Sequence, residues 1–227
     1  MEHVTASAAG AETGHSTGRA AVTAVVLDIG NVVLAWEPVA AVAGRVGLRQ
    51  WEEFVVGADF AGLNARSDAG EPFETIVAEL AAAHPRRPDW VEILRTYRRH
   101  HTDSLPGPVP GAPELIEDLV TRGVAVYALT NFDAEPFEAA RRRFPVLERF
   151  AGVVVSGREH LVKPDPAIFT VLLERFGLDA ERTLFVDDSP ANTRAAAALG
   201  LQVHLFTGIG RLRAELCEHG LLRAPVD

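Results

Sequence analysis

From residue 113 to the C-terminus, segments with helical periodicity alternate with short apolar segments rich in β-branched residues. The predicted helices cover 113–122, 133–143, 166–176, 190–199 and 210–219, and the predicted strands cover 124–130, 152–156, 183–187 and 201–206. Helices of this length between consecutive strands make right-handed crossovers, which join parallel strands and cover both faces of the sheet. With a further strand predicted at 22–27, the pattern predicts a doubly wound, Rossmann-like α/β core.

The stretch that follows the first predicted strand is helical throughout. Apolar residues recur there every three or four positions, and the predicted helices cover 38–46, 50–56, 72–83 and 89–100. The segment 104-SLPGPVPGAP-113 then reads as a linker, because it holds four prolines and two glycines. We therefore expect an all-helical cap of residues 35–106, inserted into a core made of residues 21–34 and 107–227. Residues 1–20, rich in Ala, Gly, Ser and Thr, are expected to form a flexible leader.

Charge and cysteine content exclude several classes of partner. The formal net charge of −9 argues against a nucleic-acid surface, which would carry a basic stripe. The longest mostly apolar stretch, 22–36, is broken by Asp28 and is too short to predict a membrane span. The one cysteine, Cys217, cannot form an internal disulfide, so a reducing cytoplasm is the expected location.

Polar side chains stand where the predicted strands end. In parallel sheets of this kind, ligands bind in the crevice beyond the carboxyl ends of the strands. The residues concerned are Asp28, Thr130, Asn131, Asp187 and Asp188, with Lys163 in the loop before the helix at 166–176. Three separate strand ends and one loop therefore point to a single site.

These residue types suit one kind of chemistry. Neighbouring carboxylates repel one another unless a cation joins them, and Mg²⁺ prefers carboxylate oxygens and shares its shell with substrate phosphates. An aspartate beside such an ion can act as a nucleophile, while a hydroxyl and a lysine can hold phosphoryl oxygens. Each residue alone also has an ordinary explanation as a turn, cap or surface residue. Their shared position at one edge of the sheet favours a site.

Four segments in this order resemble the motifs of the haloacid dehalogenase superfamily. They are 25-VVLDIGNVV-33, 128-ALTN-131, 162-VKPDPAIF-169 and 184-LFVDDSPAN-192. Members of that superfamily are mostly magnesium-dependent phosphatases with an inserted cap domain. The resemblance covers nearly everything from about residue 21 to about residue 221, and it implies Mg²⁺ as the cofactor and a small phosphorylated molecule as the partner.

The resemblance also implies a role for each motif residue. Asp28 matches the nucleophile, Thr130 the hydroxyl that binds the phosphoryl group, and Lys163 the lysine that stabilises its charge. Asn131 follows Thr130 and is expected to contribute to substrate binding with it. The expected metal ligands are Asp28, the backbone carbonyl of Gly30, Asp187 and Asp188.

Gly30 departs from the pattern of the superfamily. Most of its phosphatases carry a second aspartate at this position, which protonates the leaving group and later activates water. The Asp-x-Gly-Asn-Val form resembles a subgroup that includes bacterial α-D-glucose-1-phosphate phosphatases, whose substrate has a better leaving group than an alkyl ester. Another possibility is that a cap residue such as Glu37 supplies the proton. The expected function is a magnesium-dependent phosphohydrolase that acts on a small phosphorylated metabolite through an aspartyl-phosphate.

Other functions stay open at this point. A 2-haloacid dehalogenase would use the aspartate without metal, but those enzymes typically lack the paired metal aspartates and carry an aspartate at the position of Asn192. A protein that only binds a phosphoryl group or another ligand is a further possibility. Arg95, Arg98 and Arg99 could bind a second anion of a substrate, although a solvated helix face explains them better. The oligomeric state is left open.

Overall fold

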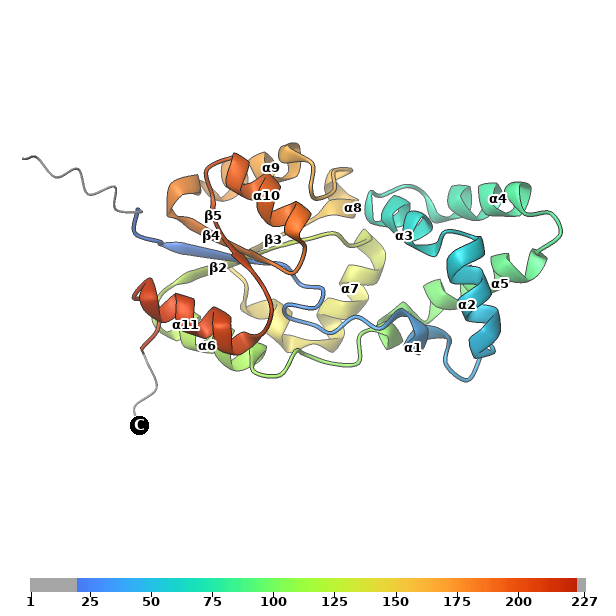
Figure 1. Cartoon of the computed structure of the whole chain (residues 1–227), viewed down its shortest axis with the longest axis horizontal. Helices are drawn as coiled ribbons and strands as arrows, with labels where there is room; N and C mark the ends of the chain where they lie inside the picture. The colour runs from blue at the N-terminus through green and yellow to red at the C-terminus, as the bar shows by residue number, and fades with distance from the viewer. Residues whose placement is uncertain (1–19, 224–227) are drawn as a thin grey trace, which may run out of the picture.

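A parallel sheet of five strands forms the centre of the computed structural model, which describes residues 20–223. The strands are β1 (Ala24–Leu27), β2 (Ala125–Thr130), β3 (Gly152–Val155), β4 (Thr183–Asp187) and β5 (Gln202–Leu205). Their order across the sheet is β3-β2-β1-β4-β5, so β1 lies in the middle (Figure 1). Each neighbouring pair is parallel, and the predicted doubly wound fold class is confirmed. Residues 1–19 of the predicted leader lie outside the described residues.

Helices cover both faces of this sheet. They are α6 (Ala112–Thr121), α7 (Ala134–Arg143), α8 (Ser156–Glu159), α9 (Pro166–Phe176), α10 (Pro190–Ala198) and α11 (Ile209–Glu218), with short 3₁₀ turns η2 (Pro145–Arg149) and η3 (Ala180–Arg182). α9 and α10 pack on one face, and α6, α7 and α11 pack on the other (Figure 1). Because both faces are covered, the central strands are apolar along their whole length, as the fully buried β1 shows.

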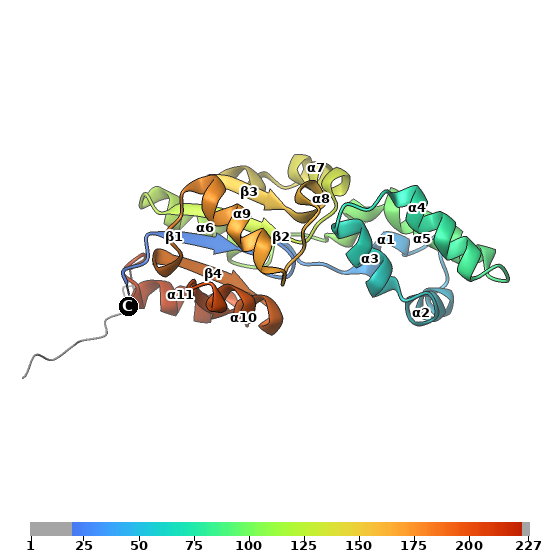
Figure 2. The ribbon, with the colours of Figure 1, turned by 90° about the horizontal axis from the view of Figure 1, so that it is seen from above.

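All five strands run toward the inserted cap, so the carboxyl edge of the sheet faces it (Figure 2). β1 pairs with β2 on one side and with β4 on the other, which places the residues that follow these strands next to one another. Among the helices of residues 20–223, none has both the length and the apolar character needed to cross a membrane.

The cap consists of helices with an apolar core of their own. They are α1 (Pro38–Val42), α2 (Leu48–Gly57), α3 (Phe60–Asp68), α4 (Phe73–Ala83) and α5 (Pro88–Arg99), followed by the turn η1 (His101–Ser104). Aromatic rings fill the cap core: the ring centroids of Trp51 and Phe60 lie 5.0 Å apart, and those of Phe60 and Tyr97 4.9 Å apart. These helices fall within the predicted range 35–106, and the exact division of the chain into domains stays a prediction.

The sequence prediction missed one of these helices, α3. Its sequence, FAGLNARSD, offers only Phe60 and Leu63 as buried apolar residues, so its periodicity is weak. The helix begins after Asp59, whose side chain accepts a hydrogen bond from the backbone N–H of Gly62. The first predicted cap helix, 38–46, is too long, because the chain leaves the helix after Val42 and reaches Gly44 at φ +72°.

The end of α3 docks the cap onto the core. Ser67 donates a hydrogen bond to the Asp133 carboxylate at 2.6 Å, and Arg98 of α5 binds the same carboxylate at 2.5 Å. Ser156, the first residue of α8, donates to the backbone carbonyl of Asp68 at 2.5 Å. These contacts join the cap to the segments that follow β2 and β3, and they fix where α3 ends.

Gly70 tests this docking. It has φ +81°, and a Cβ atom there would lie 2.6 Å from the carbonyl oxygen of Gly157 in the core, whereas a Cβ at Gly44 (φ +72°) would meet nothing within 4 Å. Both Gly→Ala changes impose the left-handed penalty of about 1–2 kcal/mol. We expect Gly70→Ala to lower the free energy of unfolding by about 1–3 kcal/mol more than Gly44→Ala does, measured by urea denaturation. Equal losses would show that the Gly70–Gly157 contact does not hold the cap.

Candidate active site

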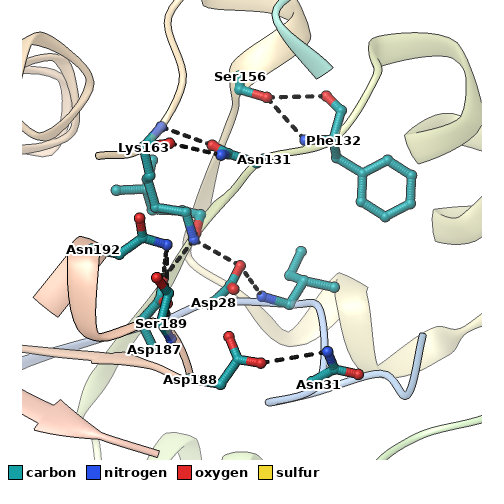
Figure 3. Close-up of polar contacts among 12 residues, drawn as sticks. Asp28, Asn31, Asn131, Phe132, Ser156, Lys163, Asp187, Asp188, Ser189 and Asn192 are labelled. Carbon is teal, nitrogen blue, oxygen red and sulfur yellow. Dashed lines mark hydrogen bonds and ion pairs between the residues drawn. The ribbon is translucent and has the colours of Figure 1, made fainter. Parts of the chain in front are cut away.

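Three carboxylates meet at the carboxyl edge of the sheet. Asp28 follows β1, Asp187 ends β4, and Asp188 comes next (Figure 3). One oxygen atom of each lies within 4.8 Å of the others. The adjacency of β1 and β4 produces this cluster, since a parallel pair brings its carboxyl ends to the same edge.

Lys163 enters the cluster from the loop before α9 and is the only lysine in the sequence. Its side chain is 1% exposed, and its Nζ lies 2.8 Å from Oδ1 of Asp28 and 2.7 Å from Oδ2 of Asp187 (Figure 3). The same ammonium donates to the backbone carbonyl of Leu129, in β2, at 2.9 Å. Three acceptors around one buried ammonium satisfy its donors, which is the condition for keeping such a charge inside a protein.

The two adjacent aspartates have different surroundings. Asp187 is fully buried, and its oxygens accept from Lys163, from the Asn192 amide at 3.0 and 3.1 Å, and from the Ser189 backbone N–H at 2.8 Å. Asp188 is exposed and receives one long contact, 3.4 Å, from the Asn31 amide. Asp187 therefore holds Lys163 in place, whereas Asp188 keeps oxygen lone pairs free.

The oxygens left free suit a hard divalent cation. Oδ1 of Asp28 is taken by Lys163 and by the Ile29 backbone N–H at 2.7 Å, and no hydrogen bond from the described residues engages Oδ2. Gly30 lies on the same cavity wall and offers a backbone carbonyl. Carboxylate and carbonyl oxygens are the ligands Mg²⁺ takes, so the residues present fit this ion. Asp187, also predicted as a ligand, belongs to the cluster but already accepts several hydrogen bonds, and the assignment of Asp28, Gly30, Asp187 and Asp188 as ligands stays a prediction.

Burial shapes the charges of this cluster. Burial raises the pKa of Asp28 and the Asp187 charge raises it further, although Lys163 acts in the opposite direction. Burial by itself would lower the pKa of Lys163, but the two carboxylates outweigh it and the ammonium stays protonated. A cation at the cluster would favour the ionised form of Asp28, which is the form a nucleophile requires.

The residues after β2 support the Lys163 loop. Thr130, the last residue of β2, is buried and lines the cavity, and its contact with a phosphoryl oxygen stays a prediction. Asn131 also lines it, but its amide is engaged at both ends: Nδ2 donates to the Lys163 carbonyl at 2.9 Å, and Oδ1 accepts from the Lys163 backbone N–H at 2.8 Å. The predicted substrate contact of Asn131 stays a prediction, and the structure gives this residue a positioning role.

Backbone geometry does not require a glycine at position 30. Its φ lies outside the left-handed region, and a Cβ atom there would meet nothing within 4 Å. The neighbouring Asn31 does adopt φ +56°, and its side-chain oxygen accepts from the Trp36 backbone N–H at 3.1 Å, which shapes the turn into the cap. Neither the backbone conformation nor a steric clash with a Cβ atom therefore explains why an acidic residue is missing at position 30.

A cavity of about 310 Å³ lies between the cluster and the cap. Its floor is the carboxylate cluster with Thr130 and Lys163, and the cap and its linker contribute the other side. The residues on that second side are Trp36, Asn64, Asp68, His101 and Leu105. Sequence reasoning missed Asn64 and Asp68 because it missed α3; the available signal was Asp68-Ala-Gly, an acidic residue just before a helix-ending glycine.

Other candidates from the sequence lie elsewhere. Glu37 is exposed and is not among the residues that line this cavity. Arg95, Arg98 and Arg99 line a separate groove between α5 and α7, where Arg98 binds Asp133 and Arg95 binds Glu74. The second-anion role, which the sequence favoured less than a solvated helix face, would require these arginines at the cavity beside the carboxylate cluster, and they are not among its lining residues.

A capped α/β hydrolase is the class of protein that this fold and this site define together. Comparison with known families agrees, because the family model of the haloacid dehalogenase-like hydrolases matches residues 22–200. The chain belongs to this family and is a hydrolase, so the resemblance read from the four motifs is confirmed at family level.

Characterised relatives include named phosphatases. The chain is 28% identical to the sesquiterpene phosphatase astK of Aspergillus oryzae over 187 residues, which cover 78% of this chain and 86% of that protein. It is also 28% identical to a phosphoglycolate phosphatase of Mesorhizobium japonicum, over 61% of this chain and 63% of the relative.

Solved structures share the fold. A predicted HAD-like hydrolase from Porphyromonas gingivalis superposes with a TM-score of 0.67 at 21% identity, covering 87% of this chain and 98% of the other. A HAD family enzyme from Bacteroides thetaiotaomicron, in complex with magnesium and inorganic phosphate, has a TM-score of 0.62 at 20% identity, covering 82% of this chain and 95% of the other.

Removing the Lys163 charge should unbalance the cluster. In Lys163→Met the Asp28 and Asp187 carboxylates lose their shared cation, and breaking a buried ion pair in this way lowers the free energy of unfolding by about 3–5 kcal/mol. The loss should be largest at neutral pH and shrink in acid, where the Asp28 carboxyl, whose pKa is raised by burial, can take up a proton. Urea denaturation at pH 7 and pH 4.5 measures both effects.

A surface ion pair provides the control for this prediction. Arg175 binds Glu159 through two hydrogen bonds but is 41% exposed, so Arg175→Met should lower the free energy of unfolding by less than about 1 kcal/mol. If Lys163→Met has as small an effect at neutral pH as Arg175→Met, the cluster does not depend on the lysine.

Proposed function

We propose that this hydrolase is a Mg²⁺-dependent phosphatase that acts on a small phosphorylated metabolite through an aspartyl-phosphate. The observation that carries the proposal is the cluster itself: Asp28 shares a buried lysine with Asp187, and one oxygen of each of Asp28, Asp187 and Asp188 lies within 4.8 Å of the others. Cation ligands and a nucleophile are thus within reach of the same phosphoryl group. Two phosphatases among the relatives support the same activity.

Each residue then has a defined task. The Asp28 carboxylate attacks phosphorus, the bond from phosphorus to the leaving oxygen breaks, and the phosphoryl group is held on Asp28 until water releases it as inorganic phosphate. The Thr130 hydroxyl holds a phosphoryl oxygen, and the positive charge of Lys163 balances the charge that develops on the phosphoryl group. Mg²⁺, when bound by Asp28, Asp188 and the Gly30 carbonyl, supplies further neutralisation of these oxygens.

The cavity limits the size of the substrate. A volume of about 310 Å³ accommodates a phosphoryl group and a small organic part, and pockets of this size are typical for small ligands. Asn64 offers hydrogen bonds, while Trp36 and Phe132 offer apolar surface. A sugar phosphate or a molecule of similar size fits this mixture. Among sugar phosphates we propose α-D-glucose-1-phosphate first, because the Asp-x-Gly-Asn-Val motif around Gly30 resembles the phosphatases that act on it.

A 2-haloacid dehalogenase is the less favoured alternative. The hydrogen bonds of Asn192 to both oxygens of Asp187 maintain the Lys163 pair, and Asp188 is left free for a cation that dehalogenation would not need. A dehalogenase structure also shares the fold, with a TM-score of 0.62, but at 19% identity this likeness concerns the fold alone. The acidic net charge and the single cysteine accord with a small-molecule partner and a cytoplasmic location, which stay predictions.

A phosphate-release panel tests the proposal. Sugar phosphates, phosphoglycolate, nucleotides, acyl phosphates and an aryl phosphate are incubated with Mg²⁺ or with EDTA, and inorganic phosphate is measured. We expect release from at least one small substrate, loss of it in EDTA, and a fall of about 10⁴-fold or more in Asp28→Asn, because the nucleophile is gone.

The same panel contains its control and its contrary outcome. Asp179→Asn makes the same chemical change at an exposed residue before β4, at the opposite edge of the sheet, and should hydrolyse the substrates like the wild type. Halide release from 2-haloacids that persists in EDTA, with no phosphate released from any substrate, would establish the dehalogenase instead.

A further inference from the structure

The cavity contains one carboxyl group that the proposed mechanism does not use. Asp68, the last residue of α3, lines the cavity from the cap side, together with Asn64 one helical turn earlier. Figure 1 shows that α3 is the cap helix next to α8, at the border between cap and core. Asp68 therefore lies across the cavity from the residues that follow the strands.

The geometry of phosphoryl transfer gives this position a meaning. The attacking oxygen, the phosphorus and the leaving oxygen are roughly in line, so a leaving group displaced by Asp28 on the sheet side departs toward the cap. Gly30 stands where most phosphatases of the superfamily carry the aspartate that protonates the leaving group, and glycine has no acidic side chain. A proton donor must therefore come from the side where Asp68 lies.

Asp68 has the protonation state that such a donor needs. Burial and the nearby Asp133 charge raise the pKa of Asp68 to about 7, with Asp28 acting in the same direction and Arg98 against it. His101, the other titratable group on the cap side of the cavity, is shifted the other way: burial and the Arg98 charge lower its pKa to about 4. At neutral pH the imidazole has already lost its proton, whereas a large fraction of Asp68 still carries one.

Its hydrogen bonds hold Asp68 in place without consuming its proton. The Asn64 amide donates to Oδ2 of Asp68 at 2.9 Å, and the Ser156 hydroxyl donates to its backbone carbonyl at 2.5 Å. The neighbouring Ser67 donates to Asp133, which fixes the end of α3 against the core. A donor must be held within hydrogen-bonding reach of the leaving oxygen, and cap docking provides this constraint.

We propose that Asp68 is the general acid and base that replaces the side chain missing at Gly30. As the bond from phosphorus to the leaving oxygen breaks, the proton of the Asp68 carboxyl moves to that oxygen, giving a neutral alcohol and an Asp68 carboxylate. The carboxylate then takes a proton from the water that attacks the phosphoryl group on Asp28, which restores both aspartates and releases phosphate. This inference rests on the proposed phosphatase function.

A comparison of leaving groups tests the role of Asp68. Phenyl phosphate has a poor leaving group and needs a proton, whereas 2,4-dinitrophenyl phosphate expels a stable anion and does not. In Asp68→Asn, kcat/KM for phenyl phosphate should fall by about 10²-fold or more, while kcat/KM for 2,4-dinitrophenyl phosphate changes little. A residue with a merely structural role would lower both to the same extent.

Glu37→Gln is the matched control. It also converts a cap carboxyl to an amide, but at an exposed residue outside the cavity, so both substrates should react as in the wild type. An equal fall for both substrates in Asp68→Asn, or no fall for either, would overturn the proposal. So would a selective loss on phenyl phosphate in Glu37→Gln, which would make Glu37 the donor.

The wild-type protein gives a second readout that does not depend on how a variant folds. The acid form of Asp68 is present below its raised pKa and is lost above it, so kcat/KM for phenyl phosphate should decline as the pH rises past about 7. The profile for 2,4-dinitrophenyl phosphate should lack this decline. Identical alkaline profiles would contradict the role of Asp68 while leaving the phosphatase function intact, and inactivity on both would contradict the phosphatase function.

Discussion

The buried ammonium of Lys163 is the interaction on which the site depends. It lies within 2.8 Å of one oxygen of Asp28 and one of Asp187, and it also binds the Leu129 carbonyl. Three elements, β1, β2 and β4, are therefore tied to one charge at the edge where they end. Arginine carries all the other side-chain positive charge apart from histidine, yet its planar guanidinium could not replace this compact donor of three hydrogen bonds.

This arrangement divides the labour between the two consecutive aspartates. Asp187 is committed to Lys163, Asn192 and the Ser189 backbone, and its burial protects that network from water. Asp188 lines the cavity and receives only one long hydrogen bond among the described residues, so its carboxylate oxygens are available to bind a cation. Two residues adjacent in sequence thus have different roles, Asp187 in positioning Lys163 and Asp188 in binding, because successive side chains point in different directions at a strand end.

The cap completes the site. Phe60 and Leu63 of α3 pack in its apolar core, and its contacts with Asp133 and Ser156 place the end of α3 at the cavity that holds the carboxylate cluster. In the proposed mechanism the nucleophile belongs to the sheet and the acid belongs to the cap. Catalysis would then require the two parts to be docked, and it would depend on the same contacts that hold the cap against the core.

The sequence by itself determined the parallel α/β core and most of the site. Short apolar segments rich in β-branched residues identified the strands, and period-3.6 patterns identified the core helices. Strand ends identified Asp28, Thr130, Asp187 and Asp188, because chain direction alone puts such ends at one edge. Only the tertiary structure decided the rest. It brought Asp68 into the cavity through a helix of weak periodicity, left Glu37 outside, and moved the α5 arginines to another groove. Those outcomes depend on how the cap docks, and docking is a sum of long-range contacts that no local pattern encodes.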